Sequence, residues 1–175
     1  MFSLKDITNF SNTQDYLPIF NAALITDLTV ILMTILGYIK SKTLKEWYHK
    51  YEISAVIADV LSIFIGVIVA RFIYSTFFTR TSGIFIFIII AVAFQVCHDL
   101  FFAKLFNSIP RGKSGILDTF KDYAKEIGST ILLADASMII STIIIGSILA
   151  NLDTNSNIII STVFIYLTPY LLYSV

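Results

Sequence analysis

The apolar and polar residues of this chain are segregated into long apolar runs and short polar segments. Five runs approach or exceed the roughly 20 residues that an α-helix needs to cross a bilayer core; they cover residues 17–39, 53–78, 83–106, 127–150 and 158–175. The last run is the shortest and contains Pro169, so four spans plus a C-terminal helix is the alternative. The pattern predicts an all-α, polytopic transmembrane bundle of five spans in a single domain, 17–175, after a polar N-terminal segment, 1–16.

Composition also places the chain in a membrane. Hydrophobic residues make up 57% of the 175 residues and charged residues 14%, and the mean hydropathy is +0.83, which is far more apolar than a soluble domain permits. The formal net charge is zero and the basic residues form two short clusters, so a nucleic-acid-binding surface has no support. The partner predicted from composition is the lipid bilayer, and no cofactor is expected.

Basic residues are concentrated on one side of the predicted membrane. Only Lys5 and Arg80 lie on the other side. In the first inner connection, or in and next to the second, lie Lys40, Lys42, Lys45, Lys50, Lys104, Arg111, Lys113, Lys121 and Lys125. Because loops rich in Lys and Arg stay in the cytoplasm, the N-terminus is predicted outside and the C-terminus inside. Trp47 and Tyr48 would then lie in the inner aromatic belt. Arg71, within the second span, is expected to extend its side chain to the outer headgroups.

The inner connection 107–126 has the pattern of a helix on the membrane surface. Apolar residues fall on one side of this helix and charged residues on the other, as in amphipathic interfacial helices. Arg111 and Lys113 precede it and are predicted to contact anionic lipid headgroups. Whether the helix continues into the fourth span or breaks at Gly128 is open.

Each of the first four runs carries one aspartate in an apolar context: Asp27 in LITDLTV, Asp59 in VIADVLS, Asp99 in VCHDLFF and Asp135 in LLADASM. At 1.5 Å per residue, three of them lie about 9 to 12 Å from the inner ends of their predicted spans, and Asp27 about 18 Å. Small and polar residues share the helical face of each aspartate, which is typical of helix contacts in lipid. Four charges facing lipid would cost on the order of 10 kcal/mol, so the acids are predicted to face a common interior.

Four carboxylates that face one another need neutralisation, because repulsion and poor hydration both oppose their charges. Protons, a bound cation, water or a protonated histidine could supply it, so proton or cation binding is assigned to Asp27, Asp59, Gln95, His98, Asp99 and Asp135. Packing alone is the alternative for each, with Gln95 as an interhelical donor and His98 as a packing residue. Asp and His are suitable metal ligands, so a metal site stays possible, but no HExxH motif or Cys pair supports one. No catalytic residue is assigned.

Four stretches carry a resemblance to a known family. ADVLSIFIGVIVAR, QVCHDLFF, PRGKSGILDTFKDYAKE and LLADASM, in this order, resemble a family of small polytopic membrane proteins encoded by large DNA viruses of algae and protists. The resemblance covers roughly residues 50–175. The family is uncharacterised, so the resemblance implies a viral origin and a virion or host membrane, and it implies no reaction and no functional residue.

Three classes of function fit these observations. The first is a proton or cation channel or transporter that uses the acids, and it is favoured. The second is a structural or interaction protein of a viral or host membrane, in which the polar groups only specify helix packing. The third is an intramembrane enzyme acting on lipid, for which no nucleophile motif is present. Small-residue pairs, Gly66/Ala70 and Gly146/Ala150, also suggest a homo-oligomer.

Overall fold

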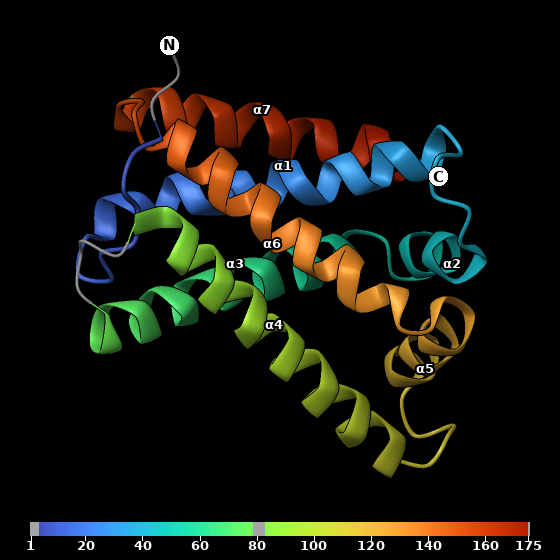
Figure 1. Cartoon of the computed structure of the whole chain (residues 1–175). Helices are drawn as coiled ribbons and strands as arrows, with labels where there is room; N and C mark the ends of the chain where they lie inside the picture. Colours follow the sequence, from blue (N-terminus) through green and yellow to red (C-terminus); the bar gives the residue numbers. More distant parts are fainter. Residues whose placement is uncertain (1–3, 79–82, 175) are drawn as a thin grey trace.

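The computed structural model describes residues 4–78 and 83–174, and within these ranges the chain is helical and without strands (Figure 1). The elements, in order, are η1 (Thr13–Asp15), α1 (Tyr16–Ile35), α2 (Lys42–Tyr51), α3 (Ile53–Phe77), α4 (Gly83–Ser108), α5 (Gly115–Ile127), α6 (Thr130–Leu149) and α7 (Thr154–Leu172). The helices α1 (with η1), α3, α4, α6 and α7 are long and apolar enough to cross a membrane. This confirms the predicted all-α fold with five candidate spans. Arg80 lies outside the described residues.

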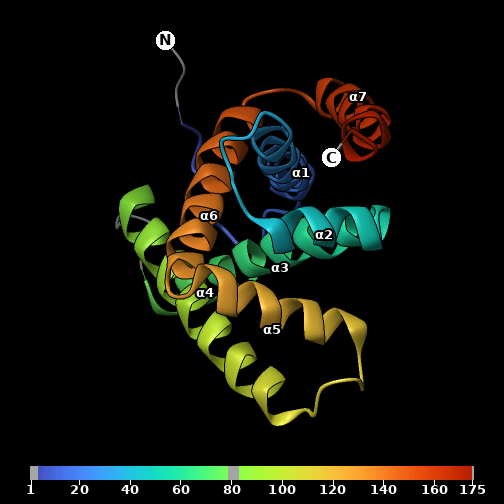
Figure 2. The ribbon, with the colours of Figure 1, turned by 90° about the vertical axis from the view of Figure 1, so that its right-hand side faces the viewer.

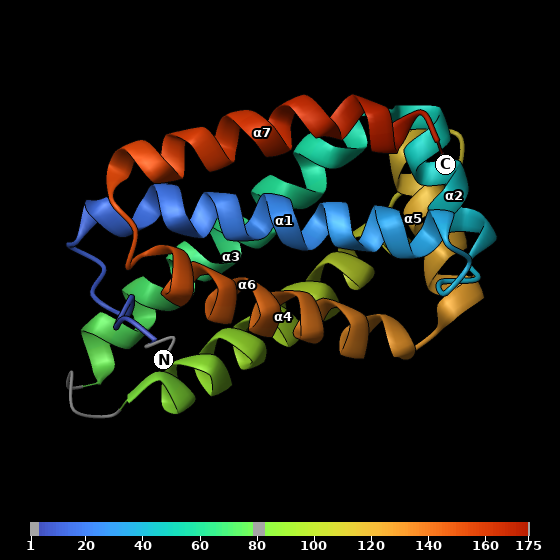
Figure 3. The same cartoon turned by 90° about the horizontal axis from the view of Figure 1, so that it is seen from above.

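Helix α1 lies at the centre of the bundle. It packs against α6, α7 and α3, while α4 packs against α3 and α6 (Figures 1 and 3). Polar pairs supplement the apolar contacts: Thr142 of α6 donates to Thr26 of α1 at 3.1 Å, and Asn21 of α1 donates to the carbonyl oxygen of Asn157 in α7 at 2.8 Å. Inside a membrane such interhelical bonds hold neighbouring spans in register.

The two ends of the bundle differ in charge and cover. Helices α2 and α5 and the last turn of α7 lie together at one end, as Figures 1 and 2 show; we call it the basic end, because it carries the two clusters of lysine and arginine. The N-terminal segment and the first turn of α7 lie at the opposite end, which we call the N-terminal end (Figure 3). Helix α4 diverges from α1 toward the basic end.

Helix α1 ends four residues before the predicted boundary, at a glycine. Gly37 has a φ of +78°, a left-handed conformation that glycine adopts without a steric penalty. The N–H of Gly37 donates to the carbonyl of Thr34 at 3.2 Å, and the N–H of Tyr38 donates to that of Met33 at 2.9 Å. This pair of bonds is a Schellman motif, which ends the helix and turns the chain toward α2.

Helix α2 occupies the first basic connection, where no helix was predicted. Its N-cap is Ser41, whose hydroxyl accepts the N–H of Leu44 at 3.0 Å. Glu126 of α5 accepts the N–H groups of Lys42 and Thr43 at 2.7 and 2.8 Å. Because these N–H groups have no partner within the helix, the carboxylate both satisfies them and fastens α2 to α5.

Helix α5 occupies the second half of the predicted amphipathic connection, 107–126, and ends one residue beyond it. It begins after Ser114, whose hydroxyl caps it by accepting the N–H of Leu117, and it ends at Ile127. Gly128 follows with a φ of +64°, so the helix breaks there and does not continue into α6.

Candidate functional site

The four aspartates lie at one level of the bundle, near the basic end. Counted along their helices, they are five to nine residues from that end: Asp27 in α1, Asp59 in α3, Asp99 in α4 and Asp135 in α6. At 1.5 Å per residue these positions lie about 8 to 14 Å inside the bundle. The extra depth predicted for Asp27 disappears because α1 ends at Ile35 and not at residue 39.

Helix α2 presents two aromatic donors to the first pair of acids. The Tyr48 hydroxyl donates to Oδ1 of Asp27 at 3.0 Å, and the indole N–H of Trp47 donates to Oδ2 of Asp59 at 2.8 Å. Tyr48 also lies close to Asp59, and the charges of the two acids interact. Trp47 is 5% exposed and Tyr48 is 1% exposed. The prediction that both belong to an interfacial belt is therefore wrong, since they are buried hydrogen-bond partners of the acids.

The same acids alter the titration of nearby phenols. Burial and the carboxylates of Asp27 and Asp59 raise the pKa of Tyr48 well above its ordinary value. Burial, followed by the carboxylate of Asp135, raises the pKa of Tyr123 in α5 to about 12. Both phenols are therefore neutral at physiological pH.

Helices α4 and α6 contribute the second pair of acids. Oδ1 of Asp99 accepts the amide of Gln95 at 2.7 Å and lies 3.2 Å from Nδ1 of His98. The carboxyl group of Asp135 lies close enough to interact with that of Asp99. The His98 ring also packs on Phe102 at a centroid distance of 4.3 Å, so it serves both a polar and an apolar neighbour.

The two pairs form one electrostatic site. The charge of Asp135 interacts with those of both Asp99 and Asp59. Within the described residues, Oδ2 of Asp27 and Oδ2 of Asp99 are buried without a partner among the assigned hydrogen bonds, as are atoms of Arg71, Asp118 and Ser147. The carboxyl groups of Asp99 and Asp135 lie close enough for a hydrogen bond when one of them is protonated. A buried polar atom without a protein partner needs a proton, an ion or water, so the Oδ2 atoms of Asp27 and Asp99 identify positions where such a partner would bind. All six residues assigned from the sequence lie at this site.

Helices α2 and α5 lie as a cover across the basic end of the bundle (Figure 2), and aromatic contacts join them. Trp47 packs on Phe120 of α5 with ring centroids 4.8 Å apart, and Phe120 packs on Phe106 of α4 at 5.6 Å. The hydroxyls of Tyr51 and Thr119 lie 3.3 Å apart. The cover is thus held by side chains from three elements.

A cavity of about 210 Å³ lies at the basic end beside this cover, lined by Tyr48, His49, Glu52, Leu172 and Tyr173. Tyr48 contacts both the cavity and Asp27. The cavity therefore approaches the acid site from the side of α2 and α7.

The described acids do not form a three-ligand metal centre. In the part of the chain that the structure describes, no three His, Cys, Asp or Glu side chains are grouped to hold a metal ion. The acids instead form two pairs, each bonded to neutral donors or to a histidine.

A buried ion pair lies at the N-terminal end. Arg71 and Asp15 are each 0% exposed, and Nη2 of Arg71 lies 3.2 Å from Oδ2 of Asp15. The same nitrogen donates to the carbonyl oxygens of Asn9 and Asn12, and the guanidinium lies over the Tyr16 ring, 5.2 Å from its centroid. The expectation that Arg71 extends to the headgroups is wrong, because its charge is neutralised inside the protein.

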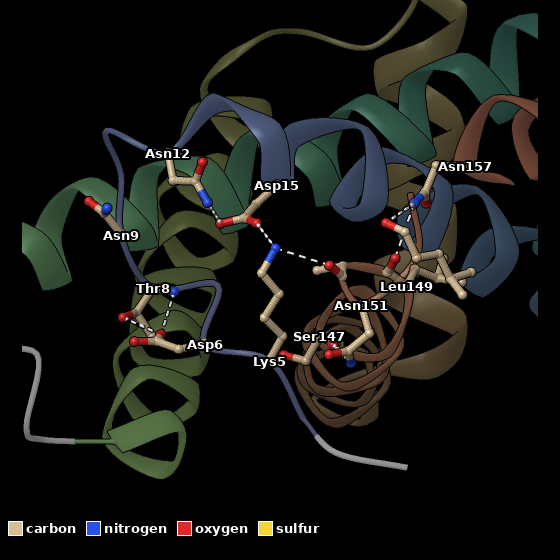
Figure 4. A network of polar contacts seen from close by, with 12 residues as sticks. Lys5, Asp6, Thr8, Asn9, Asn12, Asp15, Ser147, Leu149, Asn151 and Asn157 are labelled. Atoms are coloured by element: carbon tan, nitrogen blue, oxygen red, sulfur yellow. Dashed lines mark hydrogen bonds and ion pairs between the residues drawn. The ribbon is translucent and has the colours of Figure 1, made fainter. Parts of the chain in front are cut away.

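The N-terminal segment is fastened to the same ion pair (Figure 4). Nζ of Lys5 lies 3.4 Å from Oδ1 of Asp15 and donates to the carbonyl of Ala150 at 3.0 Å. The side chain of Asn12 donates to Asp15 at 2.8 Å, and the backbone N–H of Lys5 donates to the carbonyl of Ser147 at 3.1 Å. The segment thus closes the N-terminal end by contacts with α1, α3 and α6.

The two residues predicted to contact headgroups lie before α5 and are exposed. Arg111 forms an ion pair of 2.6 Å with Asp122, which raises the pKa of Arg111 and lowers that of Asp122. Lys113 lies two residues further on. Headgroup contact by either residue stays a prediction.

The small residues that suggested an oligomer are buried within the chain; they are Gly66, Ala70, Gly146 and Ala150. A Cβ atom on Gly66 would lie 3.4 Å from the Gln95 amide oxygen, and one on Gly146 would lie 3.5 Å from Ile19. These residues let α3 approach α4 and let α6 approach α1. The predicted homo-oligomer therefore loses this support and stays a prediction.

The sequence did not indicate that Trp47, Tyr48 and Tyr123 belong to the site. A signal was present, because Ser41 is a favoured N-cap residue and Trp47, Tyr48 and Tyr51 fall on one face of the helix that follows. The aromatic-belt interpretation competed with it and was the simpler reading of basic and aromatic residues next to a span.

Comparison with protein-family models, curated proteins and solved structures finds no match to this chain.

Proposed function

We propose that this integral membrane protein carries protons or a small cation, and that the four aspartates form its binding site. The observation that carries the proposal is the convergence of like charges from four separate spans at one level, with a buried, unpaired oxygen on Asp27 and another on Asp99. Packing alone does not require such a group, because a neutral polar residue can bridge two helices without a charge to desolvate. A proton or cation that binds here would relieve the repulsion between the acids.

The two ends of the bundle suggest which membrane surface lies nearer the site. The proposal places the basic end in the cytoplasm, on the rule that lysine- and arginine-rich connections stay inside. The site would then be nearer the cytoplasmic surface, and the N-terminal segment with Arg71 and Asp15 would close the outer side. The resemblance to membrane proteins of large DNA viruses adds a viral or host membrane as the proposed setting.

A purely structural role is the second candidate, and one observation favours it. Elsewhere in the spans, polar groups serve packing: Asn21, Asn157 and Ser161 form a hydrogen-bonded cluster between α1 and α7. Under this alternative the acids would also hold helices together, and their replacement would change stability without changing any flux.

Flux in proteoliposomes tests the proposal. The purified full-length protein is reconstituted, and internal pH and internal cation concentration are followed under an imposed gradient. We expect flux above that of protein-free vesicles, and a fall of at least tenfold in Asp135→Asn, because this substitution removes the acid that links the two pairs.

Asp122→Asn is the matched control, because Asp122 is an exposed aspartate outside the site. It should transport at the wild-type rate. The structural alternative is supported instead, and transport is rejected, if the wild type gives no flux above protein-free vesicles. If the wild type transports and folded Asp135→Asn is as active, the assignment of the aspartates as the binding site is rejected.

A further inference from the structure

The cavity at the basic end and the buried acids share one side chain. Of the residues that line the cavity, Glu52 and Tyr173 are exposed, whereas Tyr48 is 1% exposed. A volume of about 210 Å³ holds several water molecules. The Tyr48 hydroxyl donates at 3.0 Å to Asp27, whose side chain is fully buried and has one oxygen without a partner in the described part of the chain. Tyr48 thus contacts both the cavity and the buried carboxyl group of Asp27.

This arrangement discriminates between a proton and a metal cation. A sodium or potassium ion would reach Asp27 from the cavity only if the buried Tyr48 ring moved aside and gave up its hydrogen bond. A proton requires no such movement, because a hydroxyl oxygen can accept one proton while it donates another.

We propose that Tyr48 is a proton relay between this cavity and Asp27, so that the ion carried is the proton and its access route opens at the basic end. A hydronium ion in the cavity forms an O–H bond to the Tyr48 oxygen, the original hydroxyl proton passes to Oδ1 of Asp27, and water is left in the cavity. Rotation of the hydroxyl restores the starting state. The inference rests on the proposed function and names the ion and the route for the same site.

The groups that face Tyr48 are consistent with this role. They come from three other helices: Asp27 of α1, Asp59 of α3 and Tyr123 of α5. Burial and the two carboxylates raise the pKa of Tyr48, so the phenol stays protonated until a proton from the cavity replaces the one that passes to Asp27. At the mouth of the cavity, Glu52 supplies a carboxylate that accepts the Tyr173 hydroxyl at 3.4 Å.

Tyr48→Phe tests the relay, because it removes the hydroxyl and keeps the ring. In the full-length protein in liposomes we expect proton flux to fall at least tenfold under a pH gradient. Tyr170→Phe is the matched control: it removes an exposed phenol hydroxyl that is bonded to Tyr166 and lies outside the cavity lining. Its flux should equal that of wild type. The relay is refuted if folded Tyr48→Phe moves protons at the wild-type rate, or if the wild type carries sodium or potassium without a pH gradient.

A blocking experiment keeps the inference testable if Tyr48→Phe does not fold. Tyr173→Cys is made on a Cys97→Ala background, since both positions are exposed. A bulky methanethiosulfonate attached at position 173 should fill the cavity and stop proton flux, and a reducing agent should restore it. Lys113→Cys on the same background is the control, because it lies at the same end and outside the cavity lining. Unchanged flux after labelling at position 173 would exclude this route.

Different results would overturn the proposed function and the Tyr48 relay. Absence of any flux from wild type overturns the proposed function and the relay together. Flux that depends on Asp135 but is indifferent both to Tyr48→Phe and to the label at position 173 overturns the relay alone.

Discussion

At the scale of single residues, buried charges are compensated in two different ways. Arg71 and Asp15 neutralise each other, and Nη2 of Arg71 also donates to two backbone carbonyls, while Nε and Nη1 are buried without a hydrogen-bond partner in the described residues. The four aspartates near the basic end have no buried lysine or arginine among the partners that the structure gives them, and their bonds come from Trp47, Tyr48, Gln95 and His98. The first arrangement fixes structure, while the second leaves charge to be compensated by something that binds.

Replacement of Arg71 should lower the stability of the fold. In Arg71→Met, Asp15 is left buried with only the weaker contact to Lys5 and the amide of Asn12, so we expect a loss of about 3–5 kcal/mol in the free energy of unfolding. Thermal or denaturant unfolding in detergent micelles measures this loss.

A double variant separates the charge from the packing. Asp15→Asn combined with Arg71→Met should recover part of the lost stability, since no unpaired buried charge remains. Arg111→Met, which breaks an exposed pair with Asp122, should leave the unfolding midpoint unchanged. Equal effects of the Arg71 and Arg111 substitutions would contradict the buried pair.

At the scale of elements, α2 and α5 form one cover over the acid site. Glu126 caps the start of α2, and Trp47 and Phe120 pack the two helices together. Neither helix spans the membrane, yet α2 supplies both aromatic donors to Asp27 and Asp59. The position of the cover therefore decides the environment of the acids.

The Glu126 cap gives the cover a pH dependence. Hydrogen bonding with the Thr43 side chain, and then with the backbone N–H groups of Thr43 and Lys42, lowers the pKa of Glu126. A carboxyl group with a lowered folded-state pKa stabilises the fold fully above its unfolded-state pKa, and this stabilisation is lost as the pH falls through the folded-state value. Glu126→Gln should be less stable than wild type at pH 7 by roughly 0.5–1 kcal/mol, since water screens an exposed carboxylate.

The difference should disappear as the pH falls through the lowered pKa of Glu126, because wild-type Glu126 is then also neutral. Trp47 is the chain's single tryptophan and lies under the cover, so its fluorescence during unfolding reports the docking of α2. A stability gap between the two proteins that stays constant as the pH falls from neutral would contradict the cap.

The spans were predictable from the sequence, whereas the cover was not. Every observed span lies within four residues of its predicted run, because about 20 apolar residues in succession allow few alternatives. Helix α2 has only ten residues, and its buried face has the same aromatic composition as an interfacial belt. The partners of Arg71 could not be predicted from the sequence either, because two of them are backbone carbonyls, which every residue has.

At the scale of the whole molecule, the bundle has a basic end and an end closed by the N-terminal segment (Figure 3). An odd number of spans puts the first turn of α1 and the last turn of α7 at opposite ends. The acids were predicted to share one level, and the early end of α1 places Asp27 there more closely than the apolar pattern indicated. Their pairing and their aromatic donors depend on contacts between helices distant in sequence, which the pattern of single spans does not encode.

Cysteine labelling in cells tests the orientation. On a Cys97→Ala background, Ser11→Cys at the N-terminal end should react with a membrane-impermeant thiol reagent added outside, and Lys113→Cys at the basic end should react only after the membrane is permeabilised. The reverse pattern would invert the proposed topology and place the acid site near the outer surface.

The central claim is that the four carboxyl groups behave as one coupled site within the membrane. Infrared spectroscopy of the reconstituted protein, with isotope-labelled aspartate, follows the carbonyl stretch of each protonated acid during a pH titration. Coupling requires that Asp135→Asn change the titration of the acids that remain, and that Asp122→Asn leave it unchanged. If Asp135→Asn removes one component and leaves the others titrating as in wild type, the acids are independent and the account is wrong.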